Sequence, residues 1–341
     1  MARPIGSQGV ALVQRLDLAC GTRQLHDPRL GCRFALGIAA LRKILPPAPF
    51  NVAQLRGKTV AVDADNLIWS FVTALAASTD FPRAPDGRPV THLYGLLSRL
   101  TLYAKWGARS VWVFDGAQPD LKEATLIERA ERIEAARVAG DNAQAAAFVT
   151  EDDLQECRRL LSALGIPWID APGESDAQCA YLVQAGHAWA AVTQDWDIAL
   201  FGAPRALRNL TLSETRRPEL IDLAAALKTA GLTREQLVDC AILIGTDYNE
   251  GILGVGPVKA VKLVKQLGDV EGALVKLGTH VPRLSEVRAL YFAHPVDKRF
   301  VPKFKAPDAK ATLDLLAARG IPEKKGRDLL DALGAADVQS P

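Results

Sequence analysis

Short apolar runs alternate with longer amphipathic segments along the middle of the chain. TVAVD (59–63), SVWVFD (110–115) and WAAVTQD (189–195) are apolar runs that each contain an aspartate at the end. Between them lie stretches with helical periodicity, such as THLYGLLSRLTLYAKWG (91–107). This alternation is typical of βαβ units, whose strands form a parallel sheet. We therefore expect an α/β fold with a central parallel or mixed sheet flanked by helices, and a crevice at the carboxyl ends of the strands.

A segment with a different pattern follows SVWVFD. It is rich in Ala, Glu and Arg and contains few strand-forming residues, so we expect a helical insert at about 118–155 with a break near Gly140. The sheet is expected to resume at IPWID (166–170). From about residue 205 the pattern predicts helices, followed by a polar tail.

The chain therefore divides into three predicted parts. Residues 1–35 carry five arginines but neither an apolar period nor the apolar region of a signal peptide, so we interpret them as an N-terminal extension. Residues 36–245 would form the core with its insert. Residues 246–341 would form a helical region.

The composition limits which kinds of functional site the chain can contain. The chain has 341 residues, 49% of them hydrophobic, and a formal net charge of +2, which is typical of a globular protein with a sizeable core. No apolar run approaches the ~20 residues of a membrane span. The five cysteines are scattered without a CxxC spacing, which argues against a disulfide framework or a structural zinc site. Since the charge is near neutral, any nucleic-acid site has to be local. We expect a cytoplasmic protein, associated with the nucleoid if its source is prokaryotic, with no membrane partner.

Carboxylates are the abundant reactive groups, and most of them follow apolar runs. Because the carboxyl ends of parallel strands meet at one edge, we expect these acids to converge, and their repulsion favours divalent cations with oxygen ligands. We predict two Mg²⁺ ions, replaceable by Mn²⁺, that activate water for phosphodiester cleavage. The predicted ligands are Asp63, Asp115, Glu174, Asp176, Asp195, Asp197 and Asp247.

Several of these acids also have a purely structural interpretation. Glu174 and Asp176 follow Pro172-Gly173 at a predicted helix start, where acids interact favourably with the helix dipole. Asp63 and Asp115 have the positions of turn or N-cap residues after their strands. The repetition of acids at strand ends favours a metal site over capping alone.

A glycine turn forms the second informative stretch. Gly254 and Gly256 of GVGP (254–257) predict a tight turn that opens a helix and presents backbone N–H groups to a phosphate. Three lysines follow near one face of that helix, where they can contact a nucleic-acid backbone without reading sequence. A solvated helix face explains the lysines alone, and the turn favours phosphate binding. These lysines are Lys259, Lys262 and Lys265.

Five ordered motifs carry a resemblance to a known family. They are VAVDADNLIW, VFDGAQPDLK, APGESDAQCAYL, TQDWDIALFG and GTDYNEGILGVGPVKAV. They resemble the successive motifs of the flap endonuclease family, structure-specific 5′ nucleases with a PIN-like fold, and are more similar to its archaeal and eukaryotic branch. The resemblance runs from about Leu36 to Gly268, and more weakly through RALYFAHPV (288–296).

The resemblance implies a role for each matched residue. The seven acids match the metal ligands, with Asp176 standing where a glutamate is common. Lys122 and Arg129 match a basic pair that reaches the scissile phosphate; a surface helix with partners Glu123 and Glu128 is the alternative. Trp69 matches an aromatic residue that stacks on a base, against the alternative of a core tryptophan. The glycine turn matches a helix–two-turn–helix, which in the family binds duplex DNA and a K⁺ ion.

The chain also departs from the family pattern. The insert looks shorter than the usual helical arch, and the C-terminus lacks a peptide for docking on a sliding clamp. Leu36-Gly37 stands where the family has an initiator methionine and glycine, and Met1 is the single methionine. We therefore hypothesise that translation starts at Leu36; an intact mass from the native host that includes residues 1–35 would contradict this.

These features predict a metal-dependent 5′ flap endonuclease and exonuclease, a monomer acting on branched or nicked DNA in replication and repair. One alternative is a phosphatase of the haloacid dehalogenase type, because DADN (63–66) resembles that family's DxD at a strand end. That interpretation leaves the glycine turn unexplained. The other alternative is a catalytically silent DNA-binding module, against which the full acidic set argues.

Overall fold

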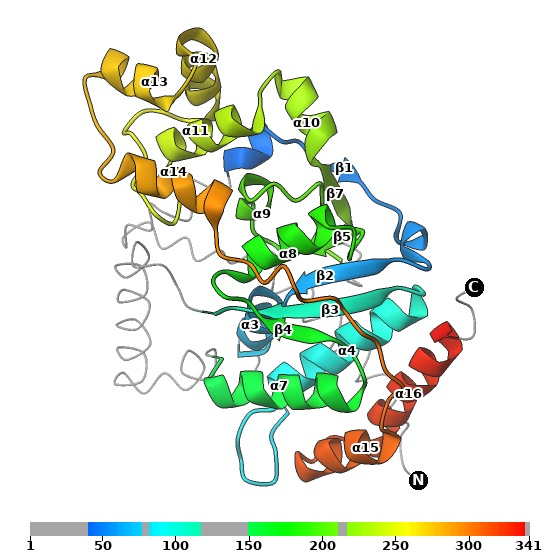
Figure 1. The fold of residues 1–341 in the computed structure, drawn as a ribbon. Coiled ribbons are helices and arrows are strands. Elements are labelled where there is room, and N and C mark those ends of the chain that lie inside the picture. The colour runs from blue at the N-terminus through cyan, green and yellow to red at the C-terminus, as the bar shows by residue number, and fades with distance from the viewer. Residues whose placement is uncertain (1–39, 77–81, 117–148, 211–216, 338–341) are drawn as a thin grey trace.

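Seven strands form one sheet at the centre of the protein (Figure 1). The structure is a computed structural model, and it describes residues 40–76, 82–116, 149–210 and 217–337. The strand order is β1-β7-β6-β5-β2-β3-β4; strands β4, β3, β2, β5 and β6 run parallel, whereas β7 and β1 are antiparallel to their neighbours. The strands are β1 (Ala48–Pro49), β2 (Thr59–Asp63), β3 (Arg109–Phe114), β4 (Trp168–Asp170), β5 (Ala190–Val192), β6 (Arg205–Arg208) and β7 (Glu219–Asp222).

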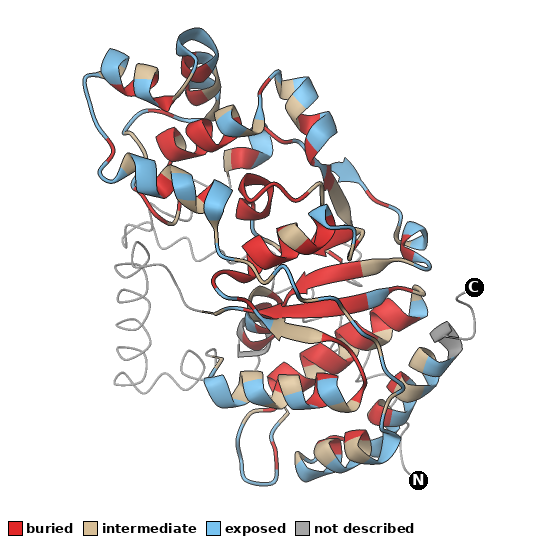
Figure 2. Cartoon of the chain, in the orientation of Figure 1, coloured by how far each residue is buried: buried red, intermediate tan, exposed pale blue. Residues whose placement is uncertain are grey.

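The central strands β2, β3 and β5 are buried on both faces (Figure 2). Along β2, Ala61 contributes to one hydrophobic core, whereas Val60 and Val62 contribute to the other, because successive side chains point to opposite faces. Helices cover both faces, which explains why these strands are continuous apolar runs. One core contains side chains of α3 (Ala64–Ala76), α4 (Thr91–Lys105) and α7 (Glu151–Ala163), and the other contains side chains of α8 (Ser175–Gln184) and α9 (Asp197–Leu200). The predicted α/β fold with a mixed, helix-flanked sheet is confirmed.

The prediction of helices from about residue 205 is wrong at its start, because β6 and β7 extend the sheet. RALR and ELID are each four residues long, too short to show a clear period. Ala206 and Leu207 pair with β5 and are buried, so the available sheet edge determines their conformation. The insert predicted at 118–155 lies mostly outside the described residues; the chain is described again from residue 149, and α7 begins at Glu151.

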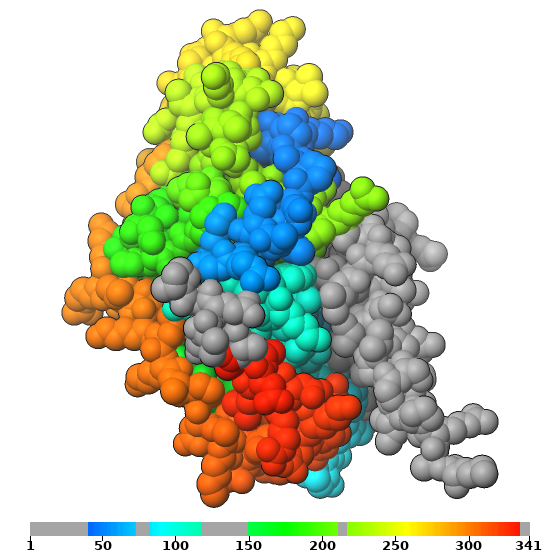
Figure 3. All heavy atoms as spheres, turned by 90° about the vertical axis from the view of Figure 1, so that its right-hand side faces the viewer, coloured from blue at the N-terminus to red at the C-terminus, as the bar shows by residue number. Residues whose placement is uncertain are grey.

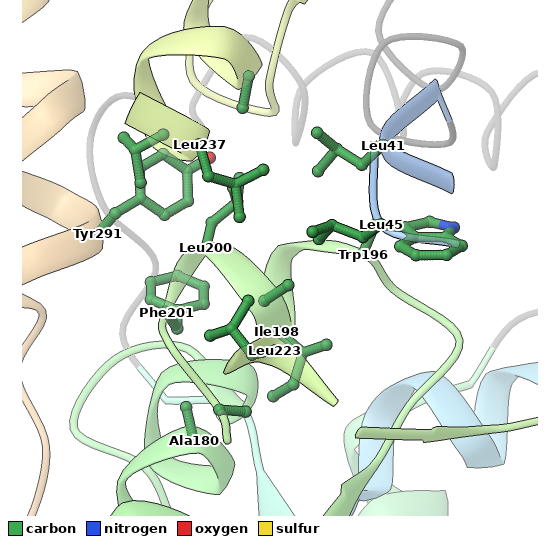
Figure 4. Close-up of a cluster of buried hydrophobic side chains, with 14 of the residues drawn as sticks. Leu41, Leu45, Ala180, Trp196, Ile198, Leu200, Phe201, Leu223, Leu237 and Tyr291 are labelled. Carbon is green, nitrogen blue, oxygen red and sulfur yellow. The ribbon is translucent and has the colours of Figure 1, made fainter. Parts of the chain in front are cut away.

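A group of helices lies beyond the β1 side of the sheet (Figure 1). Figure 4 shows how Leu237 and Tyr291 of this group lie beside Leu200 and Phe201 of the sheet domain, so one hydrophobic core joins the two parts. Its helices are α10 (Leu223–Ala230), α11 (Arg234–Ile244), α12 (Pro257–Leu267), α13 (Val270–Leu277) and α14 (Leu284–Ala293); the short helices η1 (Ala40–Lys43) and η2 (Val52–Leu55) precede the core.

An extended segment, residues 295–308, connects α14 to the last two helices. We call it the strap; it runs in front of β3 in the view of Figure 1. The backbone N–H groups of Lys305 and Asp308 donate to Gly165 and Ala163, which fixes its far end. It leads to α15 (Ala309–Ala318) and α16 (Glu323–Asp337), which form the lower part of the surface in Figure 3. No helix in the described ranges is long and apolar enough to cross a membrane.

Candidate active site

Acidic side chains gather at the carboxyl edge of the sheet. Asp63 ends β2, Asp115 follows β3, and Asp195 follows β5, as the strand-end pattern predicted. One carboxylate oxygen from each of Asp63, Asp176 and Asp195 lies within 4.8 Å of the other two. Three acids from different segments thus form a compact cluster, which we call the acidic cluster.

Asp63 is buried at the centre of a hydrogen-bond network. Its Oδ1 accepts from the Asn66 backbone N–H at 3.2 Å and from the Ser175 hydroxyl at 2.9 Å. Its Oδ2 accepts from the Thr193 hydroxyl at 3.1 Å. The residue therefore bonds the first turn of α3 and also faces the acidic cluster, so the structural and the metal-binding interpretations both apply. The network holds its carboxylate in one orientation.

Helix α8 supplies the next two acids. Glu174 is its N-cap residue, but its side chain makes no capping hydrogen bond, so capping does not explain this carboxylate. Asp176 lies in the first turn, and its Oδ1 is buried without a hydrogen-bond partner among the described residues. The Ser175 backbone N–H donates to Asp115 Oδ1 at 2.8 Å, which ties the start of α8 to the end of β3.

Burial and crowding shift the titration of the cluster. Burial, and next the charges of Asp115 and Asp195, raise the pKa of Asp63 well above its usual value. Burial, and next the charges of Asp63 and Asp195, do the same to the pKa of Asp176. Burial and Asp115 raise the pKa of Asp65 to about 7. Such a cluster is unfavourable when fully ionised, and a bound cation would relieve the repulsion.

A second set of acids lies beside two buried tyrosines. Burial, followed by the charge of Asp197, raises the pKa of Tyr291, and Asp247 and Glu174 add to this effect. Burial and Glu174 likewise raise the pKa of Tyr248. Asp197 and Glu174 also act on Asp176, which connects this set to the acidic cluster. The seven predicted acids are thereby brought to one region.

The donor set fits a hard divalent cation. Carboxylate oxygens are the ligands that Mg²⁺ and Mn²⁺ prefer, and the buried Oδ1 of Asp176 needs a partner that the described residues do not supply. Asp63, Asp176 and Asp195 would hold such an ion. Acids with raised pKa values must release protons on binding, so affinity depends on pH.

Mg²⁺ is therefore expected to stabilise the protein more at pH 8 than at pH 6. The folded-state pKa values of Asp63 and Asp176 lie above their usual value of 3.8, so the folded metal-free protein binds more protons than the unfolded chain does. These groups therefore make the metal-free protein less stable as the pH rises from about 4 toward their raised pKa values. At pH 8, Mg²⁺ has fewer protons to displace from them than at pH 6. The melting temperature with Mg²⁺ and with EDTA at both pH values measures this; a larger Mg²⁺ effect at pH 6 would contradict it.

The helix–two-turn–helix consists of α11, a compact loop and α12. Gly245 and Gly254 have φ values of 116° and 76°, which favour glycine, and a Cβ on Gly251 would lie 1.9 Å from the carbonyl oxygen of Ile244. Gly256 precedes α12 without a capping side chain, and the space where its Cβ would lie is open. The first N–H groups of α12 therefore border open space, as a phosphate site requires.

The predicted lysines are all exposed, but their ammonium groups lie in different places. Lys259 Nζ lies 3.4 Å from the carbonyl oxygen of Gly254, beside the turn, and Lys262 is exposed one turn further along. Lys265 Nζ would lie 3.0 Å from a Cβ on Gly231, so it reaches the C-terminus of α10 instead. Lys259 and Lys262 are thus the better placed pair for a phosphate backbone.

The remaining predicted residues have different outcomes. Trp69 lies on α3 with 42% of its surface exposed, so the alternative of a core tryptophan is wrong. Lys122 and Arg129 lie outside the described residues.

Sequence reasoning missed several residues that shape the site. Asp65 lies two residues from Asp63, and its Oδ2 accepts the backbone N–H of Asp115 at 2.8 Å; the DADN motif was the available signal. Asn66, in the same motif, donates to Asp195 at 2.7 Å. Arg208 on β6 gave no signal, since its segment was predicted as helix.

Arg208 places a partly buried cation beside the acids. Its guanidinium lies 4.5 Å from the ring centroid of Trp196 and donates to the carbonyl oxygen of Gln194. Burial lowers its pKa to about 10, and the charge of Asp195 opposes that shift. The cation offsets part of the negative charge of the acidic cluster.

Comparison with known proteins gives a consistent result. The XPG N-terminal domain model matches residues 36–136, and the XPG I-region model matches residues 165–247. The chain is 39% identical over 284 residues to flap endonuclease 1 of Archaeoglobus fulgidus, covering 76% of this chain and 84% of that protein. Flap endonuclease-1 from Methanococcus jannaschii superimposes with a TM-score of 0.72 at 29% identity, covering 86% of this chain and 98% of that one.

A structure of the catalytic core of Rad2 in complex with DNA substrate is also similar, with a TM-score of 0.70 at 27% identity, covering 87% of this chain and 99% of that one. The PIN-like fold and the acidic site define a nuclease of the XPG type. The chain belongs to the flap endonuclease family and is a structure-specific 5′ nuclease.

Proposed function

We propose that this nuclease is a Mg²⁺-dependent flap endonuclease and 5′–3′ exonuclease, active as a monomer on DNA with a 5′ flap or nick in replication and repair. The observation that carries this proposal is the acidic cluster, in which oxygens of Asp63, Asp176 and Asp195 lie within 4.8 Å of one another. A similar protein, the Rad2 core, has been solved with DNA substrate, which supports DNA as the partner. In a prokaryotic source the protein would act in the cytoplasm on the nucleoid.

The residues of the chain would have separate roles in phosphodiester cleavage. Divalent ions at the cluster supply a water of lowered pKa and stabilise charge on the phosphodiester when bound. Ser175, Thr193 and Asn66 hold the Asp63 carboxylate in place through hydrogen bonds of 2.9 Å, 3.1 Å and 3.2 Å. Lys122 and Arg129 would stabilise negative charge on the scissile phosphate.

The glycine turn would bind the duplex away from the cut. Backbone N–H groups at the start of α12 and the ammonium groups of Lys259 and Lys262 favour phosphates of any sequence. Backbone carbonyls of the same turn would hold a K⁺ ion, as in the family. Trp69, exposed on α3, would stack on a base near the junction.

A substrate panel tests the proposal. A 5′-labelled flap duplex, the same duplex without a flap, and a free single strand are each incubated with Mg²⁺, with Mn²⁺ and with EDTA. Cutting at the flap junction, supported by either metal and absent with EDTA, is the expected result. Tight duplex binding without cutting would instead indicate a silent DNA-binding module, and release of phosphate from small phosphoesters alone would indicate a phosphatase.

The double substitution Lys259→Ala/Lys262→Ala is expected to weaken duplex binding and to flatten its salt dependence. Each lost phosphate contact reduces the slope of log K against log salt by about one. Fluorescence anisotropy over a salt series measures this slope. Lys310→Ala is the control, because Lys310 pairs with Asp314 on α15. An unchanged slope in the double variant would assign these lysines to a solvated helix face.

A further inference from the structure

One peptide unit next to the acidic cluster is fixed at both of its polar atoms. The carbonyl oxygen of Gly173 accepts the Gly116 backbone N–H at 2.8 Å. The other half of the same peptide, the Glu174 N–H, donates to Nε2 of His294 at 2.9 Å. A peptide held at both its C=O and its N–H cannot rotate about its neighbouring bonds without losing a hydrogen bond. His294 therefore fixes the backbone from which Glu174 projects.

Gly173 leaves room for the imidazole of His294 to reach the Glu174 N–H. A Cβ on Gly173 would lie 2.4 Å from His294 Nε2, so a side chain at that position would displace the imidazole. The ring of His294 packs edge-on against Phe201, with centroids 5.2 Å apart. As an acceptor at Nε2, the imidazole is neutral and carries its proton on Nδ1. The ring is thus held in one place and in one tautomer.

The orientation of this peptide affects several acids at once. Glu174 is buried, with 5% of its surface exposed. The next residue, Ser175, bonds Asp115 Oδ1 through its N–H at 2.8 Å and Asp63 Oδ1 through its hydroxyl at 2.9 Å. A rotated Gly173–Glu174 peptide would move the Glu174 carboxylate and disturb both of these bonds.

The contact also links the metal-binding edge to the helix–two-turn–helix. His294 is the C-cap of α14, whose Tyr291 contacts Tyr248 in the loop between α11 and α12. The strap has a separate attachment, since Gln178 Oε1 accepts the Asp297 N–H at 2.7 Å and its Nε2 donates to the Asp297 carbonyl at 3.2 Å. Loss of the His294 bond is therefore expected to leave the strap in place.

We propose that His294 is a positioning residue for the metal site: by accepting the Glu174 N–H it orients the Glu174 carboxylate toward a divalent cation. This inference rests on the proposed metal-dependent function. Residues that orient metal ligands typically change metal affinity 10–100-fold when replaced. The bond also makes metal binding depend on the helical group that carries the glycine turn.

The test compares two variants of similar shape. His294→Gln places an amide oxygen near the position of Nε2, whereas His294→Met has no comparable acceptor. The first readout is the Mg²⁺ concentration that gives half of the maximal rise in melting temperature of the DNA-free protein, and the second is the Mg²⁺ concentration for half-maximal flap cutting. His280→Met, at an exposed position after α13, is the control.

For His294→Met we expect both Mg²⁺ midpoints to rise about tenfold, with duplex affinity unchanged and the metal-free melting temperature lowered by only a few degrees, because the Glu174 N–H loses its acceptor. His294→Gln is expected to stay within about threefold of the parent, since it keeps the acceptor. Equal midpoints for the Met and Gln variants would overturn the proposal, as would a Met variant that unfolds in metal-free buffer while the Gln variant stays folded. If the parent protein failed to cut flaps, the proposed function would fail, and the thermal readout would still decide the role of His294.

Discussion

Asp176→Asn is expected to reduce flap cutting about a thousandfold while making the metal-free protein more stable. A ligand lost from a catalytic metal site removes several kcal/mol of transition-state stabilisation, and each ~1.4 kcal/mol is tenfold in rate. The pKa of Asp176 is raised by burial and then by Asp63 and Asp195, so its charge is unfavourable without metal. Asparagine keeps the shape and removes the charge, which should add ~1 kcal/mol of stability, or about 2–4 °C in melting temperature.

Opposite effects on activity and stability distinguish this prediction from simple misfolding. Single-turnover cutting, duplex affinity and the melting temperature in EDTA are measured on the same preparation. Duplex affinity should stay within about twofold, because the glycine turn and its lysines are unchanged. Asp331→Asn on α16, an exposed acid far along the chain from the cluster, should alter none of the three. Unreduced cutting by Asp176→Asn would remove Asp176 from the metal site.

The second large effect is expected from Arg288→Ala, which should lower the free energy of unfolding by about 3 kcal/mol. Arg288 on α14 lies 3.1 Å from each carboxylate oxygen of Asp239, through Nε and a terminal guanidinium nitrogen. Asp239 on α11 is 1% exposed, so removing its partner leaves a buried charge unpaired. Arg288 also lies 3.4 Å from Glu271 on α13, so it connects three helices of the group that carries the glycine turn.

Urea unfolding of four chains tests this ion pair. Arg327→Ala on α16 removes an exposed pair with Glu323 and should cost less than ~0.5 kcal/mol. Adding Asp239→Leu to Arg288→Ala should recover more than half of the loss, because leucine needs no partner when buried. A loss for Arg288→Ala as small as that for Arg327→Ala would show that solvent compensates the charge of Asp239.

The sequence by itself determined the central strands of the sheet and the acids at their ends. TVAVD, SVWVF and the apolar run before Asp195 predicted β2, β3 and β5 because buried parallel strands require continuous apolar residues. Asp63, Asp115 and Asp195 then met at one edge because parallel strands end on the same side of a sheet. The five motifs added the family, which the matches to its relatives confirm.

Tertiary structure decided what depends on contacts between distant segments. RALR and ELID are too short to carry a period; RALR became a strand by pairing with the free edge of β5, and ELID by pairing in turn with RALR. Arg208 lies beside the acidic cluster because of that pairing, and no local pattern indicates it. His294 meets Glu174 across 120 positions of the chain, through a bond to a backbone N–H, which any residue except proline offers and which therefore leaves no mark in the sequence. The end of a strand is determined by the local sequence. The residues that position the acids at that end come from distant segments, so tertiary packing determines them.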